Sequence, residues 1–282
     1  PLYYLAFAGV VNVILNLFFV IVCHLGVAGV ALASMISQFI SAFLILRALL
    51  TGKEKYCLRL SEIRFDKRKA VGILQIGIPS AFQYSLFAFA NLFVQSSVNS
   101  FDHVLVEGNS AAANADPLVY DMMAAFYTAC SSFIAQNFGA RKKKRILQTY
   151  LICLFYSFIT SLVLGVGIYL ARYPFLYLFT SDKAVVEAGI TRLSIMALSY
   201  SASAFMDASI AASRGLGKTA VPTFVVVMGS CVFRIIWIYT IFAYFHTIQS
   251  LYILYVFSWG ITAIAENIYF FHVYRHTLTE KK

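Results

Sequence analysis

Long apolar runs alternate with short polar connectors along the whole chain. Each of eight runs is about 20 residues or longer, enough for a helix to cross the ~30 Å hydrocarbon core of a bilayer. No stretch shows the period-2 alternation of a membrane β-barrel. The pattern predicts an all-α polytopic membrane protein with eight transmembrane helices, at Leu2–Val22, Val27–Leu50, Val71–Val98, Asp116–Gly139, Ile146–Ala171, Leu193–Ser213, Thr223–Tyr244 and Leu251–Tyr274.

The connectors differ sharply in basic charge from one side of the predicted bundle to the other. Those on one side, with the C-terminal tail, hold 17 Lys and Arg residues, against three (Arg172, Lys183 and Arg192) at the opposite ends. By the positive-inside rule, the rich side is cytoplasmic, so we expect a multi-pass protein of the cytoplasmic membrane with its C-terminus inside. The longest basic connector, residues 51–70, is expected to be a cytoplasmic linker between residues 1–50 and 71–282. Residues 99–116 are expected to be an outer loop.

Composition excludes several other classes of protein. The chain is 61% hydrophobic and only 12% charged, which is outside the range of soluble domains. Its net charge of +10 lies in connectors rather than along an aromatic-laced surface, so it reports topology and not binding to nucleic acid. The cysteines lack metal-ligand spacing, and no nucleophile and base form a convergent set. We expect neither an enzyme nor a cofactor.

Three charged residues fall deep inside predicted spans, away from the span ends, where a charge costs roughly 2.5–3.5 kcal/mol even on the lenient insertion scale. Counting 1.5 Å per residue from the connectors places Asp207, Arg234 and Glu266 ~10–18 Å deep, in one slab of the bundle. Two interpretations stay open. They form a structural ion pair or triad, or the acids form a coupling site for a proton or cation with Arg234 as their counter-charge.

Neutral polar residues extend this layer to other helices. Gln83, Phe87 and Asn91 follow one another at intervals of four, so they share one helix face. Tyr127 reaches a similar depth on the next predicted span. The pattern favours a face that lines a cavity, with hydrogen bonding between helices as the alternative.

Asp116 and Pro117 are typical of the start of a helix, as its cap and first residue, and they predict that the fourth span begins there.

Three separated motifs resemble one transporter family. They are Ile76-Gly-Ile-Pro-Ser80 followed by Gln83 to Asn91, Phe133-Ile-Ala-Gln-Asn-Phe-Gly-Ala140, and Arg214-Gly-Leu-Gly-Lys-Thr-Ala-Val-Pro222. Together they resemble the multidrug and toxic compound extrusion (MATE) family. The resemblance implies two six-helix lobes and an N-terminally truncated chain, in which residues 1–50 end the first lobe and residues 71–282 form the complete second lobe.

The resemblance also implies a function: export of organic, cationic or amphipathic compounds in exchange for H⁺ or Na⁺. The family's cation site carries over only in part, with Asp207 as its best match and the candidate Na⁺ ligand, and with Glu266 as the remaining candidate for the glutamate role. Our own interpretation of the charges adds Arg234 as their counter-charge. Gln83, Asn91, Tyr127 and Phe87 are the expected substrate cleft. The chain departs from the family pattern twice: Phe87 occupies the place where cation-coupled members carry a glutamate, and Asp207 lies about one turn nearer Arg214 than the acid expected on that helix.

Two other functions stay open from the sequence. A flippase for lipid-linked precursors would share this architecture but would need a strongly cationic cleft, and a non-transporting membrane protein is the third reading. The expected partners are small organic substrates and membrane lipid, and the expected state is a monomer.

Overall fold

The computed structural model describes residues 2–51 and 57–277. Eight helices within these residues are long and apolar enough to span a membrane, which confirms the predicted all-α polytopic architecture. The chain divides into two compact units, residues 1–67 and 68–282. The predicted linker lies partly outside the described residues, since 52–56 are not among them, and its described part contains the short helix η2 (Leu60–Glu62).

The first unit is a helical hairpin. It is made of α1 (Leu2–Leu17), the π-helical turn η1 (Phe18–Val22) and α2 (Gly26–Thr51). The two arms pack along each other, and the side-chain amide of Asn12 donates a 3.1 Å hydrogen bond to Ser37 between them. Its assignment to the end of a first lobe stays a prediction.

The second unit is a helical bundle built around its most buried span, α8 (Lys183–Gly215). This helix makes its most extensive contacts with α4 (His103–Ala113), α5 (Ala115–Gly139), α6 (Lys143–Leu170) and α12 (Ile248–His276). Small residues allow such close contact in membranes. At Gly165 of α6, for example, an added methyl group would collide with the backbone carbonyl of Ala197.

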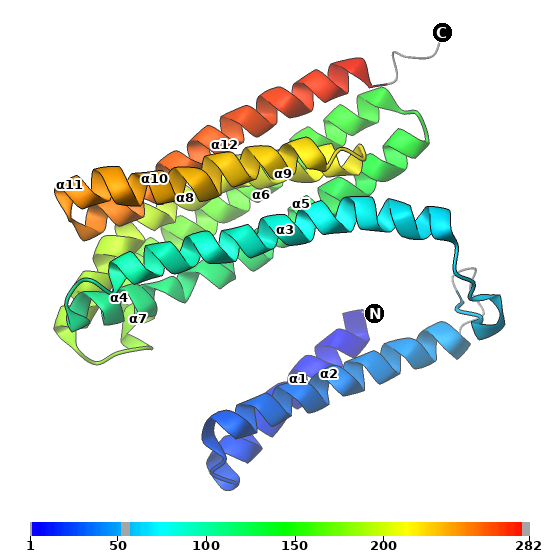
Figure 1. Ribbon diagram of the computed structural model, residues 1–282. Helices are drawn as coiled ribbons and strands as arrows, with labels where there is room; N and C mark the ends of the chain where they lie inside the picture. Colours follow the sequence, from blue (N-terminus) through cyan, green and yellow to red (C-terminus); the bar gives the residue numbers. More distant parts are fainter. Residues whose placement is uncertain (1, 52–56, 278–282) are drawn as a thin grey trace. The chain divides into compact units, whose positions relative to one another are not determined.

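One span of this unit is not a uniform α-helix. It runs as a continuous rod through α9 (Ala220–Val226), η3 (Val227–Val232), α10 (Phe233–Trp237), η4 (Ile238–Phe242) and α11 (Ala243–Phe245) (Figure 1). The segments η3 and η4 are π-helical, a geometry that is frequent at functional sites. Arg234 lies between the two.

The prediction that residues 99–116 form a loop is wrong, because most of this segment is helical. The side chain of Asp102 caps α4 by accepting a 3.2 Å hydrogen bond from the Leu105 amide. The helix then packs against α8 through Gly108, where a Cβ would meet the backbone of Val185 and Gly189. Tertiary packing therefore orders a segment that lacks the length of a membrane span.

Two predicted helix starts are also wrong. Asp116 does not cap α5, which begins at Ala115, and its carboxylate binds elsewhere. α8 begins ten residues before the predicted Leu193, after Asp182 caps it by accepting a 2.8 Å hydrogen bond from the Ala184 amide. Arg192 is therefore not at a helix end but buried within the bundle. A short helix, α7 (Arg172–Tyr177), precedes this cap.

Candidate functional site

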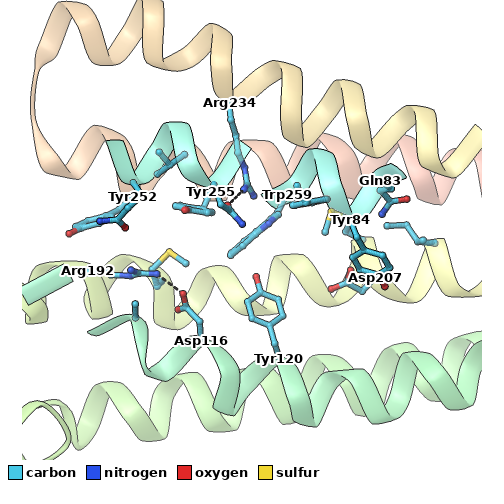
Figure 2. Close-up of a pocket in the computed structure, with 18 of the residues that line it drawn as sticks. Gln83, Tyr84, Asp116, Tyr120, Arg192, Asp207, Arg234, Tyr252, Tyr255 and Trp259 are labelled. Carbon is cyan, nitrogen blue, oxygen red and sulfur yellow. Dashed lines mark hydrogen bonds and ion pairs between the residues drawn. The ribbon is translucent and has the colours of Figure 1, made fainter. Parts of the chain in front are cut away.

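A cavity of about 460 Å³ opens inside the second unit. Its wall comes from α3 (Lys67–Val98), α4, α5, α8, α10 and α12. The wall is rich in aromatic rings, and Figure 2 shows several of them around the central space. The aromatic lining residues are Tyr84, Phe87, Tyr120, Tyr127, Tyr252, Tyr255 and Trp259. A volume of this size is typical of sites for small organic molecules.

Helix α3 supplies one side of the cavity. Gln83, Phe87, Asn91 and Gln95 all line it, because positions four apart lie on one face of a helix. Two long arginine side chains from other helices reach this face. Arg214 of α8 donates a 2.9 Å hydrogen bond to Gln83, and Arg234 of α10 donates a 2.8 Å hydrogen bond to Asn91. Tyr127 also lies on the wall. Whether these residues bind substrate stays a prediction.

Arg234 is surrounded by neutral groups. Only 1% of the residue is exposed, and its guanidinium lies over the rings of Tyr255 and Phe87, 4.6 and 5.3 Å from their centroids. Its Nε donates a weak 3.4 Å hydrogen bond to Ser258, in addition to the bond to Asn91. Within residues 2–51 and 57–277 it makes no ion pair.

A second arginine of the wall has an acidic partner. Arg192 of α8 forms a 2.6 Å ion pair with Asp116 of α5 and donates a 3.0 Å hydrogen bond to the side-chain oxygen of Asn109. The hydroxyl of Tyr200 also donates to Asp116. The network ties α4, α5 and α8 together at one end of the cavity, where Figure 2 shows Arg192 and Asp116 facing each other.

The two other candidate acids occupy different environments. Asp207 lines the cavity, and its carboxylate makes no hydrogen bond or ion pair with the described residues. Glu266 of α12 is fully buried outside the cavity wall, and neither of its carboxylate oxygens has a hydrogen-bond partner in the described chain. The cation that acts electrostatically on both acids is Arg214.

The expected triad of Asp207, Glu266 and Arg234 is therefore wrong as a set of contacts. Arg234 touches Ser258, which precedes Glu266 by eight residues, or about 12 Å along α12. Figure 2 shows Asp207 and Arg234 at separate places along the cavity wall. Counting residues estimates depth along each helix but not the direction in which a side chain points, so it does not determine which charges are in contact. The coupling roles of these acids stay a prediction.

Several residues of the site were not predicted from the sequence. The sequence places Arg192 and Arg214 in connectors because each lies near the end of an apolar run, and it predicts Asp116 as a helix cap. One signal is present: Asp116 and Arg192 are opposite charges, and both lie at the predicted outer ends of spans, the fourth and the sixth. Aromatic residues such as Trp259 and Tyr120 carried no signal, since aromatic rings recur throughout the chain.

Sequence comparisons match this chain to a protein family and to several proteins similar in sequence. The MatE family matches residues 79–240. The probable multidrug resistance protein YpnP of Bacillus subtilis (strain 168) is 31% identical over 147 residues, which cover 52% of this chain and 32% of that protein. The probable multidrug resistance protein NorM of Thermotoga maritima is 24% identical over 204 residues, covering 71% and 43%. The chain thus spans less than half the length of these relatives.

Solved structures show the same fold. A MOP superfamily transporter from Pyrococcus furiosus superposes with a TM-score of 0.88 at 20% identity, covering 98% of this chain and 62% of that one. A variant of the MATE transporter VcmN of Vibrio cholerae gives a TM-score of 0.83 at 18% identity, covering 95% and 61%. The chain therefore corresponds to about three fifths of the length of each of these solved chains.

Proposed function

The chain belongs to the MatE family of multidrug efflux transporters, and from this premise we propose that the complete protein exports amphipathic organic compounds in exchange for a proton or Na⁺. The family is one of transporters rather than enzymes. In this proposal the protein acts as a monomer in the cytoplasmic membrane, with residues 51–70 and the C-terminus on the cytoplasmic side. The cavity of the second unit is the solute site.

The single observation that supports coupling to an ion is that the carboxyl group of Glu266 is buried without a hydrogen-bond partner in the described chain. An ionised carboxylate buried without a hydrogen-bond partner costs several kcal/mol, so such a group is neutralised by a proton or a bound cation. Buried carboxyl groups of this kind mark proton and ion pathways in transporters. A proton needs one carboxyl group, whereas a metal cation is bound by several oxygen ligands. We therefore rank H⁺ before Na⁺.

Arg214 connects the coupling groups to the cavity in this proposal. It acts on both Asp207 and Glu266, and it also holds Gln83 of α3 by a 2.9 Å hydrogen bond. When the acids take up a cation, their attraction for Arg214 weakens and its hydrogen bond to Gln83 is favoured. When they lose the cation, the guanidinium is drawn toward them. The position of α3 along the cavity wall then follows the occupancy of the acids.

In this proposal Arg214, and not Arg234, balances the charge of the two acids.

A flippase for lipid-linked precursors is less well supported. The cavity is lined by three arginines and two aspartates, and one arginine is neutralised by an ion pair. This is not the strongly cationic cleft that a polyanionic lipid precursor would need.

Transport by the complete protein in proteoliposomes tests the proposal. Uptake of a fluorescent amphipathic probe, ethidium as a cation or fluorescein as an anion, is followed after imposing a pH gradient or a Na⁺ gradient separately. We expect one gradient to drive at least one probe, and Asp207→Asn to reduce that gradient-driven rate tenfold or more. Absence of gradient-driven transport of both probes would reject the function.

A further inference from the structure

The cavity of the second unit contains a buried cation without a counter-charge. Arg keeps its charge under all conditions relevant to proteins, so Arg234 cannot become neutral by losing a proton. Its contacts are with Asn91, Ser258 and two aromatic rings, all of them neutral. Removing a guanidinium from water without an opposite charge costs several kcal/mol. An anion would offset this cost.

The acids of the cavity wall do not provide that anion. Asp116 is held by Arg192 and by the hydroxyl of Tyr200. Asp207 forms no ion pair with Arg234, and the cation that acts on it is Arg214. The wall carries three arginines and two aspartates. Among the described residues, Arg192 forms an ion pair, whereas Arg214 and Arg234 do not. Arg234 is the more deeply buried of these two, and all of its contacts are with neutral groups.

Part of the guanidinium is free to bind a ligand. A guanidinium has five N–H donors in a planar fork that matches the geometry of a carboxylate. Hydrogen bonds within the described part of the chain use Nε and Nη1, and none uses Nη2. Arg234 lines the cavity. Its Nη2 has no hydrogen-bond partner, yet it is not one of the fully buried atoms without a partner, so it is accessible from the cavity. The Nε atoms of Arg192 and Arg214, in contrast, are fully buried and have no partner.

The surroundings of Arg234 suit a ring next to the negative charge. Trp259, Tyr255 and Tyr120 lie close together around it, with centroids of Tyr255 and Trp259 5.4 Å apart and those of Tyr120 and Trp259 6.1 Å apart (Figure 2). Such rings contact a flat apolar ligand in offset or edge geometry. A cavity of about 460 Å³ accommodates one or two fused rings with a polar substituent.

From these contacts we infer that the cavity binds an aromatic organic anion whose carboxylate or similar group pairs with Arg234. This inference rests on the proposed transport function and specifies its substrate class. The charge is opposite to the cationic class that the family resemblance implies.

A series of probes with one ring system and three charges tests the inference by direct binding. The probes are 2-naphthoate, neutral 2-naphthamide and cationic 2-naphthylmethylamine, measured by equilibrium dialysis with the complete protein in detergent and with empty micelles subtracted. We expect 2-naphthoate to bind at least tenfold more tightly than either other probe. Equal or tighter binding of the cation would overturn the inference.

Variants at position 234 test whether Arg234 causes the preference for the anionic probe. Arg234→Gln should weaken 2-naphthoate binding about tenfold, or about 1.4 kcal/mol, and leave 2-naphthamide binding within threefold, which also shows that the cavity is folded. Arg234→Lys should keep part of the anion preference. Arg172→Gln is the matched control, because Arg172 also lies over aromatic rings but does not line the cavity. An unchanged anion preference in Arg234→Gln would overturn the assignment.

The binding series does not depend on transport. A protein that prefers 2-naphthoate but moves no probe under any gradient retains this inference and rejects the proposed function. A protein that exports ethidium under a gradient and binds the amine best retains the function and rejects this inference.

Discussion

Replacing Asp116 by asparagine removes the charge that neutralises Arg192 while keeping the shape of the side chain. Arg192 has only 8% of its side chain exposed and Asp116 has 27%, and their atoms are 2.6 Å apart. Breaking a buried ion pair from one side costs about 3–5 kcal/mol, because the other charge stays buried without compensation. Arg192 and Tyr200 donate to different oxygens of Asp116, and asparagine has one side-chain oxygen, so the variant keeps only one of these two hydrogen bonds in the observed geometry. We expect a loss of about 3–5 kcal/mol.

The assay is the free energy of unfolding of the complete protein in mixed micelles, titrated with sodium dodecyl sulfate and followed by circular dichroism. Asp121→Asn is the matched control, since Asp121 lies on the same helix, is exposed, and makes no ion pair among the described residues. The control should change stability by less than about 0.5 kcal/mol. If Asp116→Asn costs no more than Asp121→Asn, the ion pair does not stabilise the junction of α4, α5 and α8.

Two further predictions test the contacts of α6 with its neighbours. Gly165→Ala should destabilise the protein by about 1–3 kcal/mol in the same titration, because its new methyl group would press on the carbonyl of Ala197, whereas Gly167→Ala meets no atom within 4 Å and should be neutral or slightly stabilising. Equal effects of the two would contradict the close approach of α6 and α8. Tyr150→Phe should cost about 1 kcal/mol through loss of its 2.6 Å hydrogen bond to Asn267, and an unchanged unfolding free energy would argue against that bond.

Much of the fold follows from the sequence because the bilayer imposes a simple length rule. A run such as Ile146–Ala171 must be a helix if it spans hydrocarbon, and the structure has α6 at Lys143–Leu170. The rule fails for residues 103–113, which form α4 through capping by Asp102 and packing at Gly108. The packing at Gly108 depends on the neighbouring helix α8, and neither the packing nor the cap produces a periodic pattern in the sequence.

The candidate site could be predicted only in part for a similar reason. Periodicity places Gln83, Phe87 and Asn91 on one face, and that face lines the cavity. The partner of each charge depends on helix height and rotation, which a residue count estimates to no better than a turn or two. The sequence therefore predicts acidic neighbours for Arg234, whereas the structure has Asn91 and Ser258 there, and it does not predict the pairing of Arg192 with Asp116.

The measurement that tests the central claim most directly compares binding with coupled transport in a single variant, Glu266→Gln. Glutamine keeps the size of the side chain but cannot take up or release the coupling ion. We predict that the variant binds the transported probe within threefold of the unmodified protein, because Glu266 does not line the cavity, and that its gradient-driven transport falls at least tenfold. Transport at the unmodified rate, driven by the same gradient, would contradict the account.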